Sequence, residues 1–252
     1  PPWGGNATAR FPNGVTITLL NRQVLVFRPL GYRLVPERAP ALVAGWMDVL
    51  HVPPSGDFIF YVGSGPRRAG DLSSQCEGLG VPAAIVLLDP LIGGPDHDAT
   101  TPRFLQCALQ GVASGRCRGG LISLRCATWT TATLLPDANG NPGVPRRDAD
   151  HLLVVPVNGS VPRDVREANL ESEYVGELAL AIAHAGGFVV AEQPARRTGP
   201  KAHPGHVLAG CERAVHMFDH PVWALFARST GAREIIWDQC MKAEVPSEAY
   251  VK

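Results

Sequence analysis

The stretch DFIFYVGSG, residues 57–65, decides the fold of this 252-residue chain. Its run of apolar and aromatic residues predicts a buried strand, and the closing GSG predicts a tight turn directly after it. The segment AGDLSSQCEGLG, residues 69–80, then predicts a short helix, and PAAIVLLD, residues 82–89, predicts a second buried strand that ends in an acid. A strand, a glycine-rich turn, a helix and another strand are typical of a parallel α/β sheet.

The same alternation of strand and helix patterns continues along the rest of the chain. Further strands are expected within residues 119–129, 188–194 and 233–240, and further helices within residues 101–115, 171–187 and 220–232. Strands that are separated by helices pair in parallel through right-handed crossovers. We therefore expect an α/β fold with a doubly wound, mostly parallel Rossmann-like sheet.

The N-terminal part of the chain follows a different pattern. VTITLL, residues 15–20, and QVLVFRPL, residues 23–30, predict short strands with tight turns, and residues 39–50 have helical spacing. We expect residues 1–52 to form a short β-rich extension, packed at the edge of the main sheet, and residues 53–252 to form the α/β domain.

The charge balance limits the partners that the chain attracts. Lys and Arg total 23 and so do Asp and Glu, so the formal net charge is zero and no global field draws the protein to nucleic acid or to an anionic membrane. No apolar run approaches the roughly 18 residues of a membrane span. The alternative of a local basic rim that contacts DNA is left open. Its residues would be Arg67, Arg68, Arg146, Arg147, Arg196, Arg197 and Lys201.

The cysteine content leaves two cellular compartments open. Six cysteines and the sequons at Asn6 and Asn158 would suit a secreted, disulfide-bonded protein. A chain of this size needs no disulfides, however, and its start carries no signal-peptide pattern. We expect a reduced, intracellular protein, nuclear or cytoplasmic, with secretion as the alternative.

Ligands of open parallel sheets bind beyond the carboxyl ends of the strands, which selects the candidate site. Gly63, Ser64 and Gly65 follow the first strand, and Asp89 ends the second. A glycine-rich turn lets the backbone approach a ligand, and an acid at that place can accept both hydroxyls of a ribose, so the pair favours a nucleoside-bearing cofactor. One alternative is an ordinary strand-to-helix turn. The other is an NAD-type oxidoreductase, although its GxGxxG pattern is absent. The P-loop pattern and the GxSxG pattern of α/β hydrolases are absent too.

Two reactive side chains follow later strands of the predicted sheet. Cys126 comes directly after Arg125, a cation that favours the nucleophilic thiolate. Glu192 follows the apolar run FVVA, where partial desolvation would suit it to donate a proton. The alternatives are a small buried cysteine and a loop or capping carboxylate. Neither HExxH nor CxxC occurs, so we expect no metal site.

Several stretches, taken in order, carry a resemblance to a known family. They are FYVGSGPRRAGDLSSQCEGLG at residues 60–80, IVLLD ending at Asp89, GGPDHDAT with Asp98, SLRCATWTTA with Cys126, AEQPA with Glu192, and WDQCMKAEVPSEAYVK at residues 237–252. Over about residues 57–252 the chain resembles the cytosine-5 DNA methyltransferases, and more closely a divergent branch of methyltransferase-like proteins. Leu124 and Arg125 stand where the family has Pro-Pro, and Gln193 stands where it has Asn.

The resemblance implies a methyltransferase sheet and S-adenosylmethionine as cofactor. Its implied cofactor-binding residues are Gly63, Ser64, Gly65, Asp71, Asp89 and Asp98. Cys126 matches the nucleophile that attacks carbon 6 of a flipped-out cytosine in DNA and Glu192 matches the acid that protonates ring nitrogen 3, while Arg125 completes the catalytic set as the neighbouring cation. The alternative is a catalytically decayed methyltransferase-like module that serves as a binding or structural part of a mobile-element or viral polyprotein.

Overall fold

We describe the fold from a computed structural model of the chain. The residues that it describes are 7–10, 16–20, 23–27, 43–65, 71–125, 129, 162–193 and 216–235.

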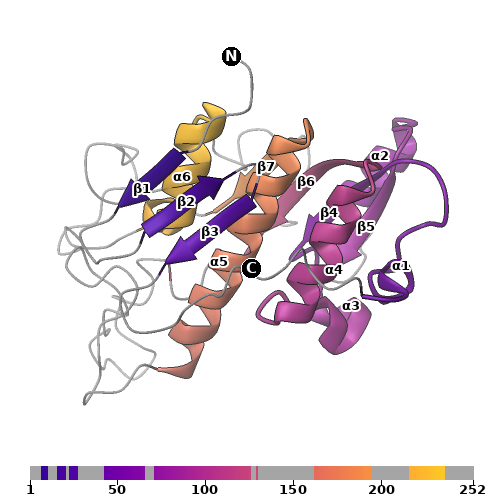
Figure 1. Ribbon diagram of the computed structural model, residues 1–252. Helices are drawn as coiled ribbons and strands as arrows, with labels where there is room; N and C mark the ends of the chain where they lie inside the picture. Colours follow the sequence, from indigo (N-terminus) through magenta and orange to yellow (C-terminus); the bar gives the residue numbers. More distant parts are fainter. Residues whose placement is uncertain are drawn as a thin grey trace, which may run out of the picture.

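A four-stranded parallel sheet forms the centre of the molecule (Figure 1). Its strands are β4 (Phe58–Val62), β5 (Ala84–Leu88), β6 (Cys117–Ser123) and β7 (Phe188–Glu192), in the spatial order β5-β4-β6-β7. All neighbouring pairs run parallel. The expected parallel α/β sheet is therefore confirmed, and its strand order is consistent with a Rossmann-like fold.

Two long helices cover one face of this sheet. Helix α4 (Pro102–Ala113) packs against α5 (Arg163–His184), and both contact β6. The fit is close, because a Cβ at Gly111 of α4 would lie 2.7 Å from the Phe60 ring and one at Gly120 of β6 would lie 2.9 Å from Ile182. Helix α6 (Pro221–Thr230) packs on α5 as a further layer. Alternate residues of β4, beginning with the fully buried Phe58, supply the centre of this core.

Side chains at the helix starts explain where the helices begin. Thr101 accepts a hydrogen bond from the Phe104 amide, and Pro102 occupies the first turn of α4. His220 caps α6 in the same way, directly before Pro221. The other helical segments are short: α1 (Trp46–Val49), α2 (Leu72–Gly78), α3 (Pro90–Gly93), η1 (Gly94–His97) and η4 (Met217–Asp219). The helix predicted over residues 39–50 is thus only one turn long within the described part.

The N-terminal strands form a sheet of their own. β1 (Ala7–Arg10), β2 (Thr16–Leu20) and β3 (Gln23–Phe27) pair antiparallel in that order. The prediction of an edge extension on the main sheet is wrong, because β2 lies near α6 and β3 near α5, and these helices separate the two sheets (Figure 1). Of the strand predicted over residues 233–240, the first three residues are not a strand and the remainder lies outside the described residues.

Candidate functional site

The carboxyl ends of β4 and β6 form the topological switch point of the sheet. The chain leaves β4 toward β5 on one side, whereas β6 pairs with β4 on the other. Here Gly63, with φ +70°, lies so close to β6 that a Cβ would be 2.1 Å from the Ser123 carbonyl oxygen. Only glycine fits this position, because both the backbone angle and the close approach exclude a side chain.

Asp89 ties the glycine loop to the neighbouring strand. One carboxylate oxygen, Oδ2, accepts a hydrogen bond from the Gly65 amide at 3.0 Å, and the other, Oδ1, accepts one from the Leu91 amide at 2.8 Å. The Gly63 amide donates to the Leu88 carbonyl at 2.9 Å, and the Ser64 hydroxyl donates to the Gly65 carbonyl at 3.1 Å. A carboxylate has about four acceptor positions, so about two on Asp89 are not filled by the described part of the chain. The structure brings together the four residues that the sequence grouped.

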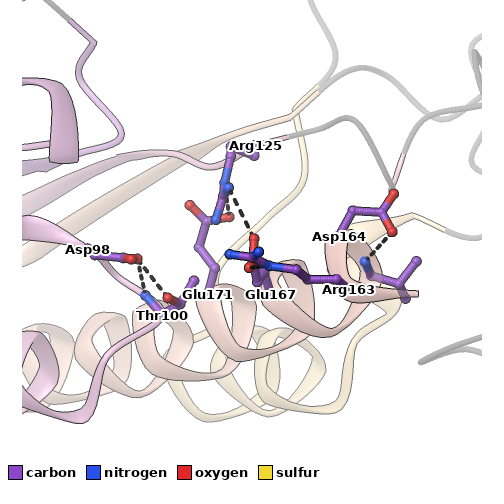
Figure 2. A network of polar contacts seen from close by, with 8 residues as sticks. Asp98, Thr100, Arg125, Arg163, Asp164, Glu167 and Glu171 are labelled. Carbon is purple, nitrogen blue, oxygen red and sulfur yellow. Dashed lines mark hydrogen bonds and ion pairs between the residues drawn. The ribbon is translucent and has the colours of Figure 1, made fainter. Parts of the chain in front are cut away.

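The other two predicted cofactor residues have local structural roles. Asp71 caps α2 by accepting hydrogen bonds from the amide and the hydroxyl of Ser74, at 2.8 and 2.9 Å. Asp98 accepts from the amide and the hydroxyl of Thr100, at 2.9 and 2.7 Å (Figure 2). Both bonds of Asp98 end on Oδ1, which leaves its second oxygen without a donor among the described residues.

Glu192 ends β7 opposite Ser123 in the parallel register. The Ser123 hydroxyl donates a hydrogen bond to Glu192 Oε2 at 3.2 Å, and the Gln193 side-chain amide donates to the Leu124 carbonyl at 3.1 Å. Glu192 is exposed, so the partial desolvation predicted for it is wrong. β7 is the outermost strand of the described sheet, and Phe188 and Val190 on the same face as Glu192 are also exposed.

A buried carboxylate near this edge escaped the sequence analysis. Glu171 on α5 is 8% exposed and faces the end of β6, where the Arg125 guanidinium Nε donates to its Oε2 at 3.2 Å (Figure 2). Burial raises the pKa of Glu171; the charge and hydrogen bond of Arg125 lower it, and the nearby Asp98 and Asp89 raise it further. Arg125, predicted as a cation beside the thiol, is therefore engaged by a carboxylate.

The pattern of α5 contains the signal that would have identified Glu171. Val175, Leu178 and Ile182 are buried on one face of the helix, and Glu171 lies one turn before them on the same stripe, at spacings of four and three residues. A charged residue that continues an apolar stripe is expected to be buried with a partner. The partner could not be identified, because Arg125 lies 46 residues earlier in the chain.

The segment that follows Arg125 is described at one further residue. Cys126 lies outside the described residues, as do the seven basic residues of the possible DNA-binding rim. Trp129 is 5% exposed, and its ring meets the His220 ring edge-on at 5.9 Å between centroids. The end of β6 thus contacts α5 through Arg125, and the N-terminal cap of α6 receives Trp129.

The described residues limit which groups the site could hold. No cluster of three or more His, Cys, Asp or Glu side chains suited to a metal ion occurs among them. Within the same residues, no helix combines the length and the apolar character needed to cross a membrane. The described cysteines, Cys76, Cys107 and Cys117, are free thiols.

Comparisons with protein-family models, curated proteins and solved structures find no match for this chain.

Proposed function

We propose that the carboxyl edge of the parallel sheet binds S-adenosylmethionine and that the protein transfers its methyl group to cytosine in DNA. The observation that carries this proposal is the Asp89 carboxylate at the end of β5, bonded to Gly65 of the glycine loop and still holding acceptor positions among the described residues. A ribose offers two adjacent hydroxyl donors, which such a carboxylate can accept together. The second oxygen of Asp98 would suit the amino group of the adenine.

In this proposal the cofactor and the target base would lie side by side along the carboxyl edge, and the strand order supports it. β4 and β5 carry the glycine loop and Asp89, whereas β6 and β7 lead to Cys126 and Glu192. Neighbouring strands are about 4.8 Å apart, so β4 and β7 are separated by about 10 Å. This spacing suits a nucleoside cofactor on one half of the edge and a flipped-out base on the other.

The proposed chemistry assigns a task to each residue on the target half. The Cys126 thiolate adds to carbon 6 of cytosine while Glu192, oriented by the Ser123 hydroxyl, supplies a proton to ring nitrogen 3. Carbon 5 becomes nucleophilic and takes the methyl group that the bound cofactor supplies, with S-adenosylhomocysteine as the leaving product. Loss of the carbon 5 proton to solvent, expulsion of the thiolate and return of the nitrogen 3 proton to Glu192 restore the ring and the enzyme.

Calorimetric titration of the full chain with S-adenosylmethionine, and separately with NADH, tests the binding step. The proposal expects micromolar binding of S-adenosylmethionine and none of NADH. Methyl transfer to DNA, followed with Cys126→Ser as the control, then tests the chemistry, because this variant should bind the cofactor and transfer nothing.

Three results would contradict the proposal in different ways. No binding at millimolar S-adenosylmethionine would remove the cofactor site. Binding of NADH instead would move the chain to the oxidoreductases. Cofactor binding without transfer to DNA in the wild-type protein would favour the decayed methyltransferase-like module.

A further inference from the structure

The chain leaving β6 is held at two described points that lie four residues apart. Arg125 pairs with Glu171 on α5, and Trp129 packs edge-on against His220 at the start of α6. These two helices are joined next to Glu171, where the Trp223 indole donates to the Ser172 hydroxyl at 3.0 Å. Both points therefore belong to one packed unit.

The Arg125–Glu171 pair is asymmetric in its exposure. The Arg125 side chain is 58% exposed and that of Glu171 is 10% exposed, so the carboxylate is the fixed partner and the guanidinium comes to it. Glu167 also faces Arg125, but at 4.0 Å, and its closer partner is Arg163 at 2.6 Å. Glu171 is thus the principal contact of Arg125 (Figure 2).

Stability alone does not explain a carboxylate at this position. Burial raises the pKa of Glu171 despite the guanidinium, so the folded protein holds the ionised carboxylate less favourably than water does. Removing charges from water commonly exceeds the attraction that a buried pair regains. A carboxylate that stays buried despite this cost points to a role for Glu171 in positioning Arg125.

We propose that Glu171 is a positioning residue of the candidate site: by holding Arg125, the residue directly before Cys126 in the sequence, it sets the reactivity of the Cys126 thiol. This inference rests on the proposed function, in which Cys126 is the nucleophile. Glu171 acts through Arg125 and does not itself touch substrate or cofactor.

The test measures how fast iodoacetamide alkylates Cys126 in the folded full-length protein, quantified at the Cys126 peptide by mass spectrometry. The variants are Glu171→Gln, Arg125→Met and their combination, with Glu167→Gln as the matched control on the same helix. We expect both single variants to raise the rate about fivefold and the double variant to raise it no further, as for two residues that act as one unit. The control should alkylate at the wild-type rate.

The directions of change separate positioning from a simple charge effect. Neutralising Glu171 leaves Arg125 with Glu167, at 4.0 Å, as its described carboxylate partner, whereas Arg125→Met removes the cation that precedes Cys126 in the sequence. Charge alone would therefore move the two rates in opposite directions. Opposite directions, or wild-type rates in both variants, would overturn the inference. Arg125→Met keeps the test decisive if Glu171→Gln does not fold, because the Arg125 side chain is mostly exposed.

S-adenosylmethionine affinity of the same variants keeps the two proposals distinguishable. We expect Glu171→Gln to bind the cofactor like the wild type, and loss of that binding would overturn the positioning role. If the wild-type protein binds no S-adenosylmethionine while both alkylation rates still rise together, the proposed function fails and the Arg125–Glu171 coupling stands.

Discussion

The two edges of the parallel sheet use similar polar residues in opposite ways. At the amino edge, Arg116 donates to the carbonyl oxygens of Gly56 and Pro53, at 2.7 and 2.6 Å, and Arg118 pairs with Asp57 at 2.8 Å on the surface. These bonds hold the segment of residues 53–57, which leads into β4. At the carboxyl edge, Asp89 and Asp98 accept from backbone amides and keep acceptor positions beyond those that the described residues fill, and Glu171 is buried.

The difference separates polar groups that hold the fold together from groups available to a ligand. Two donors of Arg116 end on the backbone carbonyls of Gly56 and Pro53, which is a structural role. The carboxylates of Asp89 and Asp98 accept from the backbone and still have capacity for another molecule.

The largest effect is expected from Gly63→Ala at the carboxyl edge. The added methyl group would meet the Ser123 carbonyl oxygen at 2.1 Å on a backbone with positive φ, so the variant should lose more than about 3 kcal/mol of unfolding free energy. Urea denaturation measures this. Gly65→Ala is the control, because its φ is similar and no atom lies within 4 Å, so it should lose only about 1 kcal/mol. Equal losses of unfolding free energy in the two variants would show that Gly63 does not lie against the Ser123 carbonyl.

A smaller, purely structural effect is expected from Arg116→Ala at the amino edge. The variant loses two hydrogen bonds to carbonyls and the contact of the guanidinium with the Phe58 ring at 5.6 Å, which together should lower the unfolding free energy by about 2 kcal/mol. S-adenosylmethionine affinity should not change. A loss of affinity without a loss of stability would assign a binding role to the amino edge and break the contrast.

The smallest effect is a pH dependence whose sign distinguishes two buried groups. Burial raises the pKa of Glu171 above its usual 4.5, so the stability that it contributes is present below pH 4.5 and is lost as the pH rises through the folded-state value. Glu171→Gln should therefore gain stability relative to the wild type over that rise. Burial lowers the pKa of His97 below 6.5, so stability is instead lost as the pH falls below 6.5, and His97→Gln should remove that loss. Thermal unfolding of both variants and the wild type across pH 4 to 8 checks both effects. If the two substitutions changed the pH dependence of stability in the same direction, the roles given to Glu171 and His97 would be contradicted.

Local patterns predicted the glycine loop and Asp89, because each ends its own strand and parallel strands bring their carboxyl ends to one edge. They also predicted a helix within residues 101–115, where α4 lies, because Pro102 at its first turn acts locally. Patterns failed where the outcome depended on neighbours in space. FVVA predicted a buried strand, yet β7 lies at the end of the described sheet and leaves Glu192 exposed.

The central claim is that the carboxyl edge binds the cofactor and the amino edge does not. Asp89→Asn and Asp57→Asn remove one carboxylate charge from each edge of the same sheet, and calorimetry gives the S-adenosylmethionine affinity of each. We predict that Asp89→Asn weakens binding at least about tenfold, as the loss of a charged hydrogen-bond acceptor does, while Asp57→Asn binds like the wild type. Equal affinities in the two variants, or a greater loss in Asp57→Asn, would contradict the claim.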